Sequence, residues 1–321
     1  PLTTKEEMAL DTERNPPWGS YHCNDETFWR RQGWMMFTTS GTTAAPRAVR
    51  HTLHDKDIWA WCDARALWSQ GVRPGDLFMI AFSYAPHVFL WGVHYACNLM
   101  GVPVVPASLD TRRRAFFMDR FKPTVLAATP SYLIYLGESM VEMGLNPAAS
   151  SAVKLITGGE PGAAISATKR RIEELWGAEL HEFIGCTEAS PVAGGYTCLP
   201  EVRQKERPIR VHVMEDTQIW EVVDPETLEP LPDGQRGLAV VTNLFSESTP
   251  LLRFLMGDYT TFDVERCACG RTHKRAIGGL QGRADDMINV RGLKFFPSAV
   301  EEIARSLPEL GNEFEIVLTT D

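Results

Sequence analysis

The stretch that decides the fold is VKLITGGEPGAAISATKRRIEELWGAELHEFIG, residues 153–185. It opens on a short apolar run with β-branched side chains, VKLITGG, which is typical of a buried strand. Apolar residues then recur with the period of a helix from Ala163 to Trp176, and a second run of the first kind, ELHEFIG, follows. The segment therefore predicts a strand, a helix and a parallel second strand.

The same alternation extends over residues 77–186. Strand-like runs occupy residues 77–83, 101–107 and 123–129, and stretches of helical period occupy residues 88–100, 112–121 and 131–143. Repeated strand–helix units predict a parallel sheet with helices on both faces. In such sheets ligands bind beyond the carboxyl ends of the strands.

After Gly195 the pattern changes to strands without helices between them, at residues 209–216, 217–225, 236–244 and 250–262. These predict an antiparallel sheet or small barrel packed on the first part. A hairpin-like segment and a helix beginning at Pro297 follow. The predicted class is α/β, with the parallel sheet followed by an antiparallel β subdomain and the start of a small C-terminal α+β domain. The predicted domains are residues 1–282, with a parallel part at 77–195 and an antiparallel part at 196–282, and residues 283–321.

Composition excludes several classes of function. The chain has 321 residues, a net charge of −9 and no basic run, which argues against nucleic acid as a partner. No apolar run reaches the roughly eighteen residues that a membrane span needs, so a cytoplasmic protein without membrane contact is expected. Seven cysteines do not resemble a disulfide framework.

One early loop gathers hydroxyl and amide donors. Residues 38–47 read TTSGTTAAPR, and a glycine flanked by Ser and Thr lets the backbone approach a phosphate closely. The alternative is an ordinary surface turn. The loop is not a Walker motif because no Gly-Lys-Ser/Thr follows, and no G-x-G-x-x-G follows an early strand.

Six segments occur in the order found in adenylate-forming enzymes: residues 38–47, 128–132 (ATPSY), 158–162 (GGEPG), 184–190 (IGCTEAS), 253–258 (RFLMGD) and 282–302. The chain most resembles the phenylacetate–CoA ligase family. The resemblance implies that ATP activates an aromatic carboxylic acid as an acyl-adenylate, which is then transferred to coenzyme A. Transfer to a carrier-protein thiol, or a catalytically impaired ligand-binding or zinc-stabilised module, are the alternatives. A homodimer is also implied.

The resemblance assigns roles residue by residue. Around ATP it implies a phosphate loop (Thr39, Ser40, Gly41, Thr42, Thr43), an adenine-site turn (Gly159, Glu160, Pro161), a strand end whose Glu188 binds Mg²⁺ (Thr187, Glu188), a ribose-binding Asp258, and nearby arginines (Arg253, Arg283). Asp285 matches the hinge of the C-terminal domain. The alternatives are a helix-start position for Glu160, a helix N-terminal carboxylate for Glu188, surface ion pairs for the arginines and an exposed turn at Asp285.

The resemblance implies two further sites. Aromatic candidates for the acyl pocket are Tyr84, Phe89, Trp91 and His94, whose spacing is also typical of a helix core. A structural Zn²⁺ is implied at Cys198, His212, Cys267 and Cys269, a closed tetrahedral set. His273 is an alternative to His212, and unliganded cysteines are an alternative to the site.

The sequence departs from the family in three places. Ala44 and Ala45 stand where the loop normally has Gly-Lys, which puts pyrophosphate handling in doubt unless Arg47 or Arg50 compensates. Ile184 replaces the aromatic that stacks on adenine, and Phe183 is expected on the opposite side of the strand. The chain also begins and ends inside family regions, so a truncated chain without the family's C-terminal lysine is expected.

Overall fold

A parallel sheet forms the centre of the molecule. The structure is a computed structural model that describes residues 1–39, 47–84, 88–107, 110–188, 190–205, 207–286, 288–290, 293–307, 310 and 314–317. Its parallel strands lie in the order β7-β6-β5-β3-β4. They are β3 (Phe78–Ile80), β4 (Val104–Pro106), β5 (Val125–Ala127), β6 (Lys154–Thr157) and β7 (Glu179–Cys186). All five coincide with predicted strands, which confirms the class of this part.

Successive side chains of these strands enter two different cores. Phe78 and Ile80 belong to one buried cluster and Met79, between them, belongs to the other. In β7, Phe183 and Ile184 divide in the same way. This alternation is the period of a strand buried on both faces. It confirms that Phe183 and Ile184 point to opposite sides.

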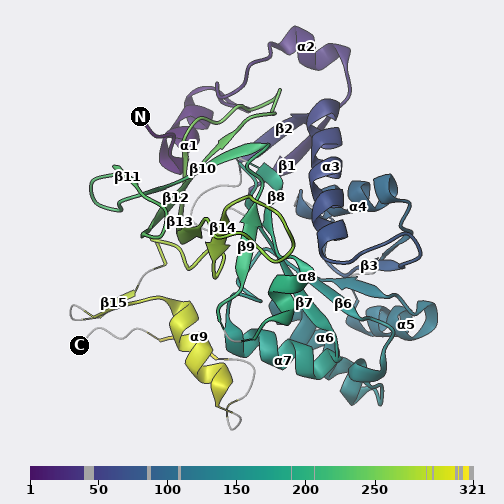
Figure 1. The fold of residues 1–321 in the computed structure, drawn as a ribbon. Coiled ribbons are helices and arrows are strands. Elements are labelled where there is room, and N and C mark those ends of the chain that lie inside the picture. Colours follow the sequence, from purple (N-terminus) through teal and green to yellow (C-terminus); the bar gives the residue numbers. More distant parts are fainter. Residues whose placement is uncertain are drawn as a thin grey trace.

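Helices cover both faces of the sheet, as the sequence predicts (Figure 1). One core contains buried residues of α3 (Leu53–Ser69) and α4 (Phe89–Met100), and the other those of α5 (Thr111–Phe121), α6 (Pro130–Glu142) and α7 (Ser166–Trp176). Asp110 and Thr129 accept hydrogen bonds at the N-termini of α5 and α6. A 3₁₀ turn, η1 (Pro147–Ala149), precedes β6.

The antiparallel strands continue the same sheet. Within the described residues, twelve strands form one sheet in the order β11-β10-β12-β13-β14-β9-β8-β7-β6-β5-β3-β4. The added strands are β8 (Ser190–Tyr196), β9 (Arg210–Val213), β10 (Gln218–Val223), β11 (Pro230–Leu231), β12 (Arg236–Asn243), β13 (Phe254–Asp263) and β14 (Arg275–Ile277), with α8 (Leu199–Arg203) between β8 and β9. The prediction of a second sheet packed on the first was wrong, because β8 pairs edge to edge with β7. That pairing was not predicted from the sequence.

The N-terminal segment adds two helices and a β-hairpin. They are α1 (Lys5–Arg14), α2 (Glu26–Arg31), β1 (Trp34–Thr38) and β2 (Ala48–Thr52). The two strands pair antiparallel, so the phosphate loop joins them; its residues 40–46 lie outside the described part. Thr52 and Asp55 form a reciprocal capping box at the start of α3. The hairpin thus passes directly into a helix of the main core.

The last segment lies against the lower edge of the molecule (Figure 1, yellow). It contains β15 (Ile288–Val290), β16 (Leu293–Phe295) and α9 (Pro297–Ser306), and α9 contacts α7. The Ala167 amide of α7 donates to Glu302 at 3.2 Å. The domain boundary at 282/283 stays a prediction. Among the described residues, no helix has both the length and the apolar character that a bilayer crossing requires.

Candidate active site and metal centre

The predicted adenine-site turn follows β6 at the carboxyl edge of the sheet. Gly159 has a φ of +89°, a left-handed conformation that favours glycine, and a β-carbon on Gly162 would lie 2.4 Å from Pro130 Cγ. The Glu160 carboxylate accepts from the amide of Ser131 at 2.7 Å, near the start of α6. The side chain of Glu160 therefore caps a neighbouring helix, and the helix-start alternative is wrong because α7 begins only at Ser166. Because the Glu160 side chain is engaged in this way, the exposed backbone of the turn is the part that a ligand can contact.

A buried carboxyl group supports this turn from the neighbouring strand. Glu182, 3% exposed on β7, accepts a hydrogen bond from the Gly162 amide at 3.1 Å. Burial raises its pKa to about 7, although the amides of Gly162 and Ala164 oppose the shift. Sequence reasoning missed this residue. Its signal was an acidic residue next to Phe183 and Ile184, in the part of the strand that the apolar pattern predicts to be buried.

The end of β7 meets the base of the phosphate loop. Thr187 and Glu188 follow β7 and precede β8, so the helix N-terminal alternative for Glu188 is wrong. The Arg47 guanidinium lies 3.3 Å from a Glu188 carboxylate oxygen, and both side chains are about 10% exposed. Thr39 and Arg47 close the loop, since the Thr39 amide donates to the Arg47 carbonyl at 3.0 Å and the Arg47 amide to Thr39 Oγ1 at 3.0 Å. The predicted ligands Ser40, Gly41, Thr42 and Thr43 lie outside the described residues, as do Ala44 and Ala45.

The predicted ribose carboxylate lies on β13. Asp258 forms an antiparallel bridge with Arg283, and burial raises its pKa to about 6 while the Arg283 charge opposes the rise. The Arg283 guanidinium donates to Asp285 at 2.8 Å. Arg283 and the hinge candidate Asp285 therefore form an ion pair beside Asp258.

Strand β13 is linked to the end of β7 through one turn. Thr260 Oγ1, on β13, donates to the Gly279 carbonyl at 3.0 Å. A β-carbon built at Gly279 would lie 3.7 Å from Ile184 Cγ2. The adenine-side strand end and the Asp258 segment are thus neighbours, although they are distant in sequence.

Arg253 is placed differently. Its Nε lies 3.1 Å from a Glu221 carboxylate oxygen on β10, with the two side chains 32% and 29% exposed. Half-exposed pairs of this kind contribute little to stability. Arg253 is therefore in a surface ion pair, which is the alternative stated for it from the sequence.

Three of the four acyl-pocket candidates form one aromatic cluster. Tyr84 Oη lies 2.9 Å from His94 Nδ1, and Trp91 Nε1 donates to the Tyr84 carbonyl at 2.8 Å. Burial raises the Tyr84 pKa to about 12 and lowers the His94 pKa. All three side chains are half-buried, at the start of α4 and the end of the segment after β3. They can present an amphipathic surface to an acid.

The fourth candidate, Phe89, packs toward the interior. Its ring centroid lies 5.5 Å from that of Phe183 and 5.8 Å from that of Phe82. A β-carbon on Gly158 would lie 3.2 Å from the ring. Phe89 therefore lies against Phe183 and the turn after β6, and its ring contacts among the described residues do not include the other three candidates.

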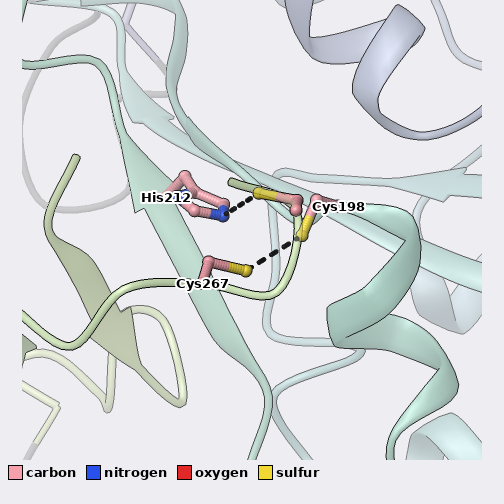
Figure 2. Close-up of side chains that lie close together, drawn as sticks. Cys198, His212 and Cys267 are labelled. Atoms are coloured by element: carbon pink, nitrogen blue, oxygen red, sulfur yellow. Dashed lines mark hydrogen bonds between the residues drawn. The ribbon is translucent and has the colours of Figure 1, made fainter. Parts of the chain in front are cut away.

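The four predicted metal ligands converge. The ligand atoms of Cys198, His212, Cys267 and Cys269 all lie within 4.8 Å of one another, and Figure 2 shows the first three side chains pointing toward a common centre. Cys198 follows β8, His212 is on β9, and the other two are in the loop between β13 and β14. His273 is not in this group, so His212 is the histidine that the described residues bring together.

The spacing of these atoms fits a tetrahedral ion. A zinc ion with Zn–S bonds of about 2.3 Å separates two sulfur ligands by about 3.8 Å. The sulfur atoms of Cys198 and Cys267 are 3.7 Å apart, and Cys269 Sγ is 3.4 Å from His212 Nε2. Burial raises the pKa of Cys198 and lowers that of His212 to about 4. Burial also opposes ionisation of Cys269, but hydrogen bonds from Arg271, Cys267 and Cys198 act together against it, and the pKa of Cys269 is lowered.

Comparison with known proteins shows the family of the chain. Residues 3–243 match the family model of AMP-binding enzymes. The chain belongs to the AMP-binding enzyme family. This AMP-binding enzyme is 36% identical to a phenylacetate–coenzyme A ligase of Thermus thermophilus over 87% of the chain and 61% of the relative, and 31% identical to one of Pseudomonas putida over 99% and 70%. The resemblance stated from the sequence is confirmed.

A solved structure gives the same result for the fold. The AMP-binding enzyme superposes on a 2-hydroxyisobutyryl-CoA ligase, in the postadenylation state with an acyl-AMP, with a TM-score of 0.89 and 30% identity. The match covers 98% of this chain and 64% of that one. The chain thus spans less than two thirds of that ligase and of the Thermus relative.

Proposed function

We propose that this AMP-binding enzyme chain carries the adenylating site of an ATP-dependent acid–thiol ligase. In the first step a carboxylate oxygen of the acid attacks the α-phosphorus, a new P–O bond forms, and the bond to pyrophosphate breaks. In the second, a thiol attacks the acyl carbon, AMP leaves, and the thiol proton passes to solvent. Such chemistry depends mainly on positioning and charge stabilisation.

One observation carries the proposal: Arg47, at the base of the phosphate loop, contacts Glu188 at the end of β7. Two segments that are far apart in sequence, each predicted to serve the phosphates, meet at the carboxyl edge of the parallel sheet. That edge is where such sheets bind ligands. The exposed turn at Gly159 lies at the end of the adjacent strand.

The chain's residues fit the groups that the reaction needs. Glu188 would hold Mg²⁺, since carboxylate oxygens at a strand end suit this ion; the ion would neutralise charge that develops on the phosphates. Asp258 offers two acceptor oxygens for the ribose hydroxyls. Arg283 lies opposite Asp258 in a backbone bridge and pairs with Asp285, so its charge would act on the Asp258 carboxylate, and Asp285 would mark the hinge.

The acid is proposed to be aromatic and the thiol to be coenzyme A. The half-buried aromatic cluster of Tyr84, Trp91 and His94 supports a flat apolar acid. The names of relatives include phenylacetate and 2-hydroxyisobutyrate, so they favour a CoA ligase without fixing the acid. A carrier-protein thiol is the second acceptor to test.

The cluster at Cys198 is proposed to hold a structural zinc ion. Three sulfur ligands and one imidazole leave no open position for a substrate. The ion would tie the β13–β14 loop to β8 and β9. It would have no part in the reaction.

Acid-dependent exchange of labelled pyrophosphate into ATP tests the function. With a panel of aryl and small aliphatic acids, we expect exchange only with the accepted acid, and a loss of about a hundredfold in Glu188→Gln. Glu174→Gln, an exposed position on α7, is the control. If calorimetry detects no binding of ATP with Mg²⁺, the chain is the ligand-binding or interaction module instead.

A further inference from the structure

The cluster of Cys198, His212, Cys267 and Cys269 would carry a net negative charge with zinc bound. A thiol loses its proton when it binds the metal, whereas imidazole binds in its neutral form. Three thiolates and one divalent cation therefore leave one negative charge. Cys198 and His212 are fully buried, and Cys267 is 4% exposed. Because an uncompensated charge in such surroundings is costly, the cluster needs a positive charge beside it.

Two arginines near the cluster do not supply this charge. Arg275 is buried, and its guanidinium lies 2.9 Å from an Asp263 oxygen and 3.4 Å from a Glu201 oxygen. Carboxylates therefore already balance the charge of Arg275. Arg266 precedes Cys267 directly, but its side chain is exposed, so water and salt screen its charge.

Arg271, in the same loop, differs from both. Its side chain is half-buried, and among the residues that the structure describes no carboxylate pairs with it. Its amide and its guanidinium both donate to the Cys269 sulfur. The guanidinium carbon lies 5.8 Å from the centre of the Tyr196 ring, which stacks on the His212 imidazole at 5.8 Å with an interplanar angle of 28°. Arg271 thus contacts one thiol ligand directly and the imidazole ligand through an aromatic ring.

We propose that Arg271 is a positioning residue of the metal centre, which balances the negative charge of the zinc-loaded cluster and orients Cys269. The inference rests on the proposed zinc ion. A guanidinium suits this role because it keeps its charge at every physiological pH and presents several donors in a fixed plane. Partners of this kind, which contact the ligands rather than the metal, typically change metal affinity ten- to a hundredfold when they are removed.

The charge of Arg271 should matter in only one state of the protein. In the metal-free chain the thiols can keep their protons, so the cluster is neutral and has no charge to balance. Loss of the Arg271 charge should therefore weaken zinc binding without destabilising the metal-free fold. A residue that only packs against the loop would affect both states.

The test is the zinc affinity of the full chain, measured by competition with a chromophoric chelator. In Arg271→Gln we expect the Kd for zinc to rise about tenfold to a hundredfold. Arg271→Lys keeps the charge, so its Kd should stay within about threefold of the wild-type value. Arg266→Gln is the matched control, since it removes an equal charge from an exposed position of the same loop. The metal-free proteins should share one Tm, and Arg271→Gln loaded with Co²⁺ should keep the intense absorption of a tetrahedral site.

Several outcomes would overturn the inference. Wild-type zinc affinity in Arg271→Gln, or an equal loss in Arg266→Gln, would remove the special role of Arg271. An equal loss in Arg271→Lys would show that charge is not the cause. A lower Tm of metal-free Arg271→Gln, or loss of the tetrahedral Co²⁺ spectrum, would make the role structural. If the wild-type chain binds no zinc, the proposed ion and this inference fail together, whereas normal wild-type binding with unaltered variants refutes the inference alone.

Discussion

Glu182 is a buried carboxyl group that supports the turn after β6. Its Oε1 holds the Gly162 amide, while its Oε2 has no hydrogen-bond partner. An unpaired oxygen in that position disfavours the ionised form. The carboxyl group that fixes the turn at Gly159 therefore lowers the free energy of unfolding above neutral pH, where it is ionised.

The pH dependence of stability should report this group. Burial raises its pKa from 4.5 to about 7, so between these pH values the native state keeps a proton that the unfolded chain has released. The free energy of unfolding should then fall by roughly 3 kcal/mol as pH rises from 4.5 to 7, with no further change from this group above 7. Urea unfolding of wild type and Glu182→Gln from pH 5 to 8 measures it. The variant should lack this slope, and Glu226→Gln, an exposed control, should keep it; parallel curves for all three would refute the assignment.

Single residues were predictable only as far as local rules reach. The opposite directions of Phe183 and Ile184 follow from strand period, and the structure confirms them. The different environments of Arg47 and Arg50 do not follow from strand period, because the position of Arg50 depends on three residues that are distant in sequence, Trp18, Trp29 and Glu26. Local sequence carries no record of such contacts.

Among the elements, the Cys/His cluster brings three separate segments together. It connects the corner after β8, strand β9 and the β13–β14 loop. Nearby, the buried Arg275 bridges Asp263 at 2.9 Å and Glu201 at 3.4 Å. These polar links lie beside buried apolar residues of the same strands, such as Val211 and Ala276.

Loss of the proposed zinc ion should destabilise this region. We expect Cys267→Ser to lose about one zinc ion per chain and to lower Tm by roughly 5–10 °C, because metal binding adds to folding stability. Metal analysis and thermal unfolding measure the two effects. Cys23→Ser changes an exposed cysteine and should alter neither. A wild-type protein that purifies from zinc-containing medium without the metal contradicts the proposal.

The hairpin strands β1 and β2 were not predicted from the sequence. Strand β2 buries Arg50, His51 and Thr52, which no apolar pattern signals. These residues are tolerated because tertiary partners satisfy two of them: Arg50 has its tryptophans, and Thr52 donates to Glu247 at 3.2 Å. The resemblance implied the group of proposed metal ligands, and the structure was needed to choose His212 over His273.

At the scale of the molecule, the C-terminal segment is held to the main body because glutamates of α9 cap the N-terminus of α7. Helix α7 has no side-chain cap of its own; instead Glu302 of α9 accepts from the Ala167 amide, and Thr168 donates to Glu301 at 3.2 Å. A carboxylate at a helix N-terminus is favourable. The proposed swing at Asp285 would have to break this contact.

Hydrogen exchange tests the cap. In Glu302→Gln we expect the amides of α9 and of Ala167 to exchange roughly fivefold faster, since a cap contributes about 1 kcal/mol. Exchange in β5 and β6 should not change. Glu174→Gln changes an exposed residue of α7 and should leave the exchange rates of α9 unchanged. If α9 exchanges at the wild-type rate in both variants, Glu302 does not hold the segment.

The edge pairing of β7 with β8 limits how the gene for this chain can be divided. Cutting between the two strands would strip hydrogen bonds from both and leave a long unpaired border on each fragment, a surface prone to aggregation. Two fragments divided there should be recovered only when they are produced together, because each supplies the strand with which the other pairs.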